Sequence, residues 1–331
     1  MIPQRHAVTI GIFSLALLSL EAHANGPRPW TPGFGADISF LVGYTDSTSQ
    51  FNTDNHTIST LDSEASSQSN AFVAPLGTVS YTTEDRKQQL YFGTSRSDLA
   101  LGRFHVELGY RYRIENNGMI TLSYVPGVLK TDTWKDPFIT DTRREETEST
   151  IQGVRFQYDK ILGSNFSLEL SGGQQAIDDE QSGFASYTPE EQAKLNREGN
   201  IFYTEIGYFH PISRFQILRS AINYTRLDAD GAAMASNSFG AEIGIIQAMR
   251  SSSLALTLSY NNTSYDESNP VFDTKQKDDK WGAFLAYEYK EPFDWENWGV
   301  VSLIGYNQSQ SNINFYDEDS LLISLGINYK F

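Results

Sequence analysis

Cysteine is absent from all 331 residues of this chain, and so is any long apolar run beyond the first 24 residues. Without cysteine there can be no disulfide framework, no cysteine-ligated zinc or iron–sulfur site and no cysteine nucleophile. A membrane-spanning helix needs about 18 or more consecutive apolar residues. The sequence therefore excludes a helical membrane protein.

Basic residues are scarce as well: 25 Lys and Arg stand against 41 Asp and Glu, a formal charge of −16. A surface that binds phosphate backbones needs clustered basic side chains, so we expect no nucleic-acid partner. Only 39% of the residues are hydrophobic, as in a soluble protein. A transmembrane β-barrel would have a similar composition, because only every second strand residue faces lipid.

The first 24 residues have the layout of a secretory signal peptide. A basic start that includes Arg5 precedes the apolar run 8–20, and Ala22-His23-Ala24 fits the small-x-small pattern that signal peptidase accepts. We expect cleavage after Ala24, which leaves residues 25–331 as one exported domain. Export without cysteine suits the envelope of a Gram-negative bacterium, because an oxidising periplasm promotes stray disulfides.

From Gly33 onward, apolar and polar residues alternate with the period of a strand, and no helix could sort them onto two faces. In the final segment, Leu325, Ile327 and Tyr329 alternate with Gly326 and Asn328. The segments with this pattern are 34–44, 103–113, 154–159, 166–171, 239–245, 254–260, 281–289 and 320–331. Each of them is predicted to be a strand with one apolar face.

The connections between these segments alternate between short and long. Short ones include 84–87 and 115–118, and the long polar ones are 46–70, 130–148, 176–199, 266–279 and 308–319. Short turns at one end and long loops at the other are typical of outer-membrane barrels. We predict an all-β fold: a transmembrane antiparallel up-and-down β-barrel of about 14 strands. Twelve strands is the alternative, because 72–82 and 88–95 have the weakest pattern.

Aromatic residues supply a separate indication of a membrane barrel. Strands predicted to run toward the periplasm end in pairs such as Tyr110 and Tyr112, and those running outward end in single tyrosines such as Tyr260. These positions predict two interfacial girdles. The end of the chain, with Tyr329 and Phe331, resembles the signal by which outer-membrane proteins are recognised for insertion, so the barrel-assembly machinery is an expected partner.

One stretch carries a resemblance to a known family. Gln88-Gln-Leu-Tyr-Phe-Gly-Thr-Ser-Arg-Ser-Asp-Leu-Ala-Leu-Gly102, running on into Phe104–Arg113, is similar to a segment of a gammaproteobacterial family of outer-membrane barrels that is catalogued as a domain of unknown function. The resemblance covers nearly the whole mature chain. It implies the fold and the location but no activity, so no functional residue is carried over from it.

A search for catalytic chemistry yields only weak candidates. After cleavage the histidines are His56, His105 and His210, and only His105, beside Glu107, is expected to point into the barrel. It could act as a general base, but an interior polar residue is the better interpretation. No serine near these histidines suggests a nucleophile. We predict no enzyme activity, no cofactor and no metal site.

Charge on the inner faces gives the functional hypothesis. The predicted pore-lining bases lie on neighbouring early strands and the acids mostly on the others, so we expect two oppositely charged walls. The predicted pore-lining residues are Arg103, Arg111, Arg113, Arg155, Glu169, Glu205, Glu242 and Glu288. An open lumen predicts a porin-like channel for passive diffusion of small hydrophilic solutes. Salt-bridged side chains that plug the lumen are the alternative.

The sequence thus predicts a monomeric barrel in the cell outer membrane, in contact with lipid and lipopolysaccharide. The alternative function is a non-conducting surface barrel for binding or adhesion, acting through its long acidic loops. Those loops carry much of the negative charge, with Asp54, Asp62, Asp178, Asp179 and Asp266 among the acids.

Overall fold

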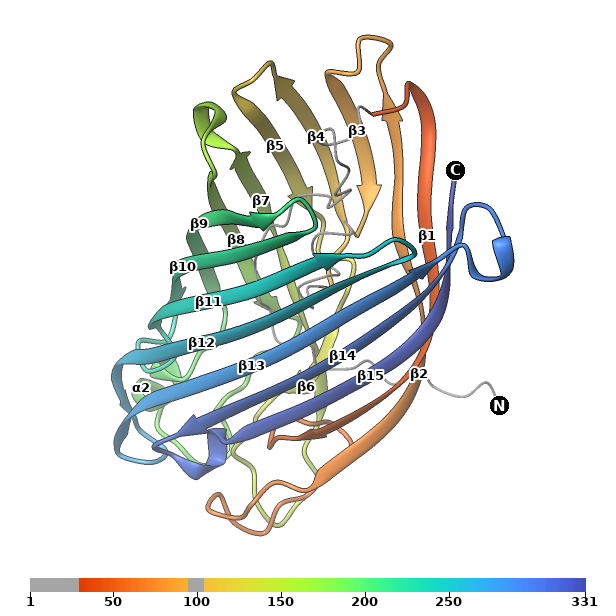
Figure 1. Cartoon of the computed structure of the whole chain (residues 1–331). Helices are drawn as coiled ribbons and strands as arrows, with labels where there is room; N and C mark the ends of the chain where they lie inside the picture. Colours follow the sequence, from red (N-terminus) through yellow and green to blue (C-terminus); the bar gives the residue numbers. More distant parts are fainter. Residues whose placement is uncertain (1–29, 95–103) are drawn as a thin grey trace.

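A computed structural model describes residues 30–94 and 104–331. Its strands form a single antiparallel sheet in which β1 (Gly33–Thr48) pairs with β15 (Glu318–Lys330), from Asp37 opposite Lys330 to Thr48 opposite Asp319. β5 (Gly118–Val125) pairs with β7 (Glu146–Asp159), so the ring is closed with 14 strands. Figure 1 shows the resulting barrel, with the strands strongly tilted. The predicted fold and the strand number of 14 are confirmed.

Most of the wall consists of long strands that pair with both neighbours. They are β1, β2 (Ser67–Thr82), β7, β8 (Phe166–Ile177), β9 (Gly199–Ser213), β10 (Gln216–Ala229), β11 (Ser236–Ala248), β12 (Ser252–Asn269), β13 (Thr274–Lys290), β14 (Trp298–Ser311) and β15. Between β2 and β7 the strands are short: β3 (Gln88–Gly93), β4 (Glu107–Ile114) and β5. We call the part from β7 through β15 to β1 the continuous wall, and β3–β5 the short-strand wall.

The strand β4 is shorter than the sequence predicts. The alternation over 103–113 predicts a strand along its full length, but the strand begins only at Glu107. Phe104 turns toward the interior, where its ring centroid lies 6.4 Å from that of Phe284. Arg103, like the expected signal peptide and the cleavage position Ala24, lies outside the described residues.

The two ends of the barrel differ in their connections. Tight turns join β2 to β3, β4 to β5 and β9 to β10 at the turn end, where the chain also finishes (Figure 1). Long segments join the strands at the opposite loop end, where β6 (Thr131–Trp134) extends one edge of β7. One of these long segments contains a short helix, α2 (Pro189–Lys194), which has a complete capping box at Thr188. The described ranges also contain three short 3-10 turns: η1 (Ile161–Gly163), η2 (Pro292–Asp294) and η3 (Asn314–Tyr316).

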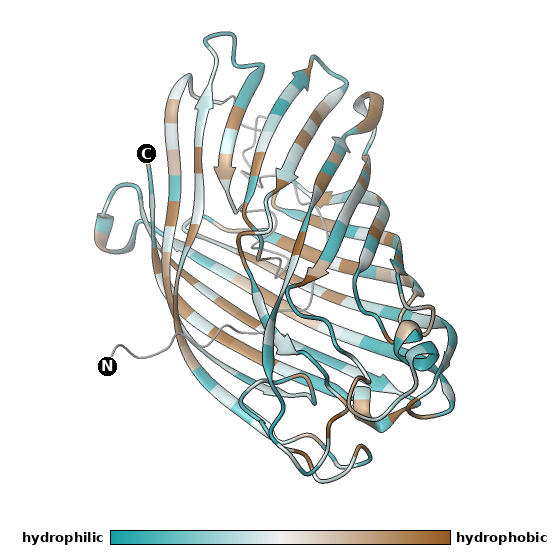
Figure 2. Cartoon of the chain, turned by 180° about the vertical axis from the view of Figure 1, so that it is seen from behind, coloured by the Kyte–Doolittle hydropathy of each residue, from teal (hydrophilic) through white to brown (hydrophobic). Residues whose placement is uncertain are grey.

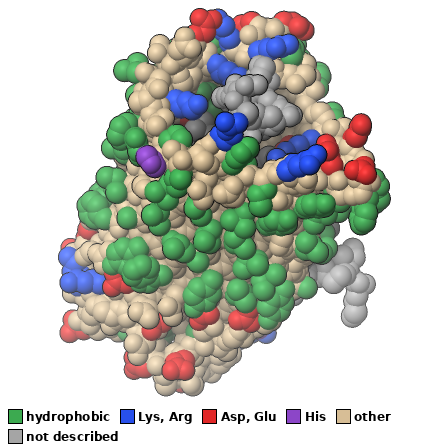
Figure 3. Space-filling view, viewed as in Figure 1, with side chains coloured by type: hydrophobic (Ala, Val, Ile, Leu, Met, Phe, Trp, Pro, Cys, Tyr) green, Lys and Arg blue, Asp and Glu red, His purple; other side chains and the backbone are tan. Residues whose placement is uncertain are grey.

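Large apolar residues cover the outside of the barrel. Figure 2 shows apolar positions recurring along the strands, and Figure 3 shows apolar side chains spread over one face of the barrel. Outward residues such as Val73, Phe239 and Leu325 are more than half exposed, whereas inward polar residues such as Ser324 and Asn328 are buried. This is the reverse of a water-soluble protein and the arrangement of a barrel surrounded by lipid.

Cross-strand aromatic pairs mark the two rims of this apolar surface. Toward the loop end, Tyr224 packs on Phe239 and Tyr260 on Trp281, with centroids 4.9 and 4.4 Å apart. At the turn end, Trp298 packs on Tyr329 at 4.9 Å. Such pairs contribute to sheet stability and place amphipathic rings at the membrane–water interface.

Within residues 30–94 and 104–331, no helix has the length and apolar content required to cross a membrane.

The long loops pack against one another at the loop end. Their buried apolar residues form one cluster: Ile58, Phe138, Leu195, Ala233, Met234, Ile313 and Phe315. These residues come from five separate connections, from the one after β1 to the one after β14. We call this assembly the loop cap. It means that the acidic loops fold into an ordered structure instead of extending separately into water.

Candidate functional site

Charged side chains of six strands meet inside the barrel in what we call the ion-pair ladder. The ladder consists of Glu107 on β4, Arg155 on β7, Glu169 on β8, Glu205 on β9, Arg219 on β10 and Glu242 on β11. All six side chains are less than one-tenth exposed. Alternation brings them to the inner face, and the register of the strands decides which of them meet.

Two arginines organise this ladder. Arg155 Nε lies 2.8 Å from Glu169 Oε1, and its Nη1 lies 3.5 Å from Glu107 Oε2. Arg219 contacts Glu205 at 2.5 Å and also Glu242. Glu169 and Glu205 stand directly opposite each other on β8 and β9, a destabilising arrangement for like charges unless each is compensated. Here each has its own arginine.

The expected separation of charge into two walls does not hold for Arg155. Arg155 lies on β7 and Glu169 lies on the adjacent strand β8, so the two side chains pair with each other instead of facing each other across the lumen. Within the described ranges, the ladder therefore has the salt-bridged character that the sequence left as the alternative. A row of pairs between adjacent strands is favoured because a buried charge without a partner is costly.

The other predicted pore-lining residues lie nearer the turn end. Arg111 donates to Gln89 Oε1 at 3.0 Å and stacks 3.8 Å above the Tyr91 ring. Arg113 lies 4.0 Å from the Trp30 ring. Glu288 accepts from Ser253 at 3.3 Å and lies 3.6 Å from Lys330 Nζ.

His105, which the sequence predicts to point into the barrel, lies beside the ion-pair ladder. His105 Nε2 is 3.6 Å from Glu107 Oε2. The nearby Ser123 hydroxyl donates to that same carboxylate oxygen at 2.6 Å, so its proton is directed to Glu107 and not to the imidazole. A serine nucleophile needs its hydroxyl paired with a base such as histidine, and this geometry does not provide that pairing. Among the described residues, no three His, Asp or Glu side chains gather as a metal site.

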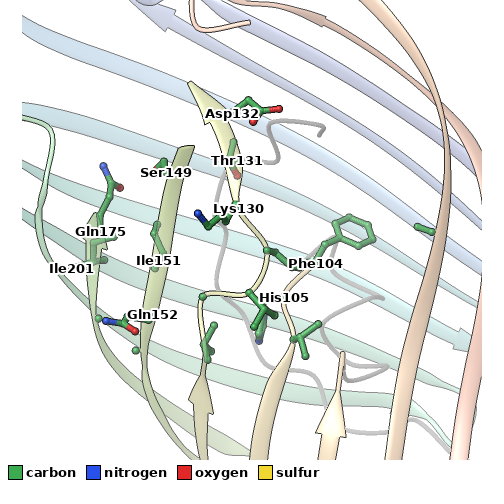
Figure 4. Close-up of a pocket in the computed structure, with 18 of the residues that line it drawn as sticks. Phe104, His105, Lys130, Thr131, Asp132, Ser149, Ile151, Gln152, Gln175 and Ile201 are labelled. Carbon is green, nitrogen blue, oxygen red and sulfur yellow. The ribbon is translucent and has the colours of Figure 1, made fainter. Parts of the chain in front are cut away.

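A cavity of about 840 Å³ lies between the ladder and the loop cap. Arg155 and Glu169 line it from the ladder side, and Thr133, Arg197 and Glu318 from the loop end. Figure 4 shows Ser149 and Ile151 of β7, Gln175 of β8 and Ile201 of β9 along one side, with Phe104 reaching in from another. The volume is in the range of sites that hold a small molecule.

Two buried arginines hold the loop cap above this cavity. Arg144 donates to the carbonyl oxygens of Gln50 and Asn55, at 2.9 and 2.5 Å, and lies 4.3 Å from the Trp134 ring. Burial lowers the pKa of the Arg144 guanidinium to about 10, which leaves it charged at neutral pH. Arg197 bonds to Glu180 at 2.7 Å and to the Trp134 carbonyl at 2.6 Å. Neither arginine stands out in the sequence, because both lie in loops without periodicity.

The apolar exterior, the closed ring and the polar interior define a transmembrane β-barrel. Residues 33–330 match the model of a family described as "Protein of unknown function (DUF2860)", and the chain belongs to this family. The match confirms the resemblance noted around Gln88–Arg113. No curated protein matches the sequence.

Solved structures with a similar architecture include outer-membrane channels. A TodX monoaromatic hydrocarbon channel mutant shares 12% identity and a TM-score of 0.48, over 91% of this chain and 90% of that one. The CymD monoaromatic hydrocarbon channel shares 8% and 0.46, over 91% and 89%. An anion-selective porin from Comamonas acidovorans shares 8% and 0.41, over 90% and 98%.

Proposed function

We propose that this barrel is an outer-membrane channel through which small solutes bearing polar or charged groups diffuse passively. The observation that supports this proposal is the cavity of about 840 Å³ inside the barrel, with Arg155 and Glu169 at one end and Arg197 at the other. Charged groups at both ends of a confined low-dielectric space favour solutes that carry a polar or charged group. The barrel has 14 strands, a size between filled eight-stranded barrels and open porins of 16 or more.

The ion-pair ladder defines how such a channel would conduct. Its side chains are paired and buried, so passage requires solutes or ions to move along them or to displace pairs. We therefore expect a small conductance instead of the large steady current of a wide pore. Refolded protein in planar lipid bilayers should show discrete single-channel steps, and current indistinguishable from protein-free bilayers would contradict the proposal.

Charge selectivity tests whether interior residues face the conducting path. Replacing Arg111 and Arg155 with Gln removes two positive charges and leaves the ladder carboxylates, so the reversal potential should shift toward cation selectivity. Arg86→Gln is the matched control, since Arg86 lies exposed on the turn between β2 and β3. A double variant whose reversal potential equals that of the control would place the conducting path elsewhere.

The loop cap favours a second candidate function, a surface that binds an extracellular partner. Its loops are held by shared apolar packing and by Arg144, which gives them a defined shape. Arg144→Ala should loosen the cap while the barrel strands persist. Loss of partner binding with unchanged conductance would favour this candidate over the channel.

A further inference from the structure

The turns at the turn end of the barrel are of two kinds. The turn 83–87 between β2 and β3 and the turn 115–117 between β4 and β5 consist only of polar residues. Each of the four turns along the continuous wall instead carries a large apolar side chain that is more than two-fifths exposed. These side chains, which we call the apolar tips, are Leu162, Phe215, Met249, Phe293 and Trp295. Exposed apolar groups on several neighbouring turns indicate a surface that is covered by a partner.

Two of these turns share the same unusual backbone. η1 follows Lys160 and η2 follows Glu291, and both preceding residues have left-handed φ values, 52° and 49°. Leu162 and Phe293 take equivalent places in the two turns and are also left-handed, with φ of 52° and 57°. This region disfavours bulky side chains, and such strain concentrates at functional sites. One strained turn thus occurs twice, and each time it presents an apolar tip, 75% exposed in η1 and 85% exposed in η2.

The apolar tips continue the lipid-facing surface beyond the aromatic rim. The backbone N–H of Leu162 donates to the hydroxyl of Tyr158, an outward residue of β7, at 3.1 Å. The backbone N–H of Trp298 donates to the carbonyl oxygen of Trp295 at 3.2 Å, and Trp298 itself packs on Tyr329 in the rim. The partner that covers the tips is therefore continuous with the lipid that surrounds the strands.

Three of the four turns also place a basic residue beside the tip. Lys160, Arg214 and Arg250 are exposed and lie within two residues of an apolar tip. In the described part of the chain, none of these three side chains forms an ion pair. Basic and apolar side chains together suit a phospholipid interface, where phosphates accept hydrogen bonds and acyl chains begin. The turn with Phe293 carries three acids instead, so its contact depends on the rings of Phe293 and Trp295.

The distribution of the tips favours lipid over a protein partner. They occur on every turn from the one after β7 to the one before β14, so they follow the rim and do not form one compact patch. In Figure 1 the polar turns after β2 and β4 stand highest, whereas the turns after β9 and β11 lie lower on the barrel. A protein interface is a compact patch on one face, but a membrane surface meets the whole rim of a wall at once.

We infer that the four turns of the continuous wall lie in the headgroup region of the phospholipid leaflet at the turn end. The apolar tips reach the boundary of the acyl chains, and Lys160, Arg214 and Arg250 contact lipid phosphates. The turns 83–87 and 115–117 stand in water on the other side of the barrel. The barrel is thus seated obliquely, with lipid contact extending past the strands along one wall, whether or not its lumen conducts.

A chain without cysteine allows a direct test with single-cysteine variants that carry a nitroxide label in phospholipid vesicles. Leu162→Cys and Phe293→Cys report the tips, and Arg86→Cys and Asn116→Cys are matched controls, because all four residues have left-handed φ values between 52° and 58°. Oxygen concentrates in hydrocarbon and a nickel chelate stays in water, so the ratio of their collision rates measures depth. The ratio at both tips should be several-fold above that at both controls.

Two outcomes of this measurement would overturn the proposal. Equal ratios at tips and controls would mean that the tips stand in water when only lipid is present, which leaves a soluble protein as their partner. Dipolar broadening of the Leu162→Cys spectrum that persists at high lipid-to-protein ratio would mean that a second copy of the chain covers the turn. Heat-modifiable mobility in gels verifies that every variant is a folded barrel.

Lipid retention tests the phosphate contacts with the full chain. In native mass spectrometry, the variant Lys160→Gln/Arg214→Gln should retain about twofold fewer phosphatidylglycerol molecules than wild type. The matched control Arg86→Gln/Lys87→Gln removes two basic residues from a polar turn and should retain as many as wild type. Equal retention by the two double variants would overturn the assignment of these side chains to lipid phosphates.

Discussion

The continuous wall and the short-strand wall belong to one closed ring but differ in how far their strands pair. β12 and β13 pair from Ser252 opposite Tyr289 to Asn269 opposite Thr274, with one irregularity. β3 has only Gln88–Gly93, and its neighbour β4 begins at Glu107. The first wall satisfies its backbone groups by strand pairing over its full height, as the hydrocarbon phase demands. Among the described residues, the second does so over only part of that height, because its regular pairing is interrupted at Gly93 and Val125.

Glycine at the interruption should be the most sensitive position of this comparison. Gly93→Ala places a Cβ against the Gly77 carbonyl in a backbone conformation that disfavours side chains, so we expect a loss of more than about 3 kcal/mol in unfolding free energy. Gly172→Ala, in the continuous wall, meets its nearest atom only at 3.9 Å, on the Phe202 ring. This control should fold as well as wild type or slightly better. Urea unfolding in lipid vesicles distinguishes the two; equal stability would mean that the glycine does not fix the interruption.

Inward-facing arginines should differ between the walls by a smaller amount. Arg219 is 1% exposed between Glu205 and Glu242, so Arg219→Met leaves two buried carboxylates without their cation and should cost about 3–5 kcal/mol. Arg111 has a hydrogen bond to Gln89 and a stacking contact with Tyr91, and Arg111→Met should cost about 1 kcal/mol. The same unfolding measurement ranks them, and a reversed order would show that the ladder is not the main polar support.

The smallest effect is expected at the turn end of the short-strand wall. Lys87 Nζ and Glu115 Oε1 lie 2.5 Å apart across two turns, in contact with water. An exposed ion pair of this kind contributes little because water and salt screen it. Lys87→Ala should leave the unfolding midpoint unchanged at moderate salt concentration. A clear drop would mean that the turns help to hold the short strands together.

The barrel could be predicted from the sequence because two simple features of the sequence encode it. Alternation along segments such as Leu321–Phe331 gives strands with a lipid face, and the lengths of the connections give the two ends. The segments with the weakest pattern, 72–82 and 88–95, fall at the interrupted part of the wall. Alternation is weak there because Phe72 and Leu76, on the inner face of β2, are apolar residues that line the cavity.

The ion-pair ladder and the loop cap were harder to predict from the sequence. Periodicity places Arg155 and Glu169 on the inner face, but only the register of β7 against β8 shows that they pair. The loop cap depends on contacts between five connections that share no periodic signal. The two prolines and two glycines at positions 75, 77, 93 and 126 are the features that could have indicated where regular pairing is interrupted, because each weakens it.

Solute entry into vesicles tests the central claim most directly. Liposomes containing the refolded wild-type chain are diluted into iso-osmotic arabinose, and the initial rate of swelling is read by light scattering. If the interior cavity belongs to a passive channel for small polar solutes, swelling should exceed that of liposomes with heat-denatured chain and should slow for larger sugars. Swelling equal to that of the denatured control for every sugar would contradict the account.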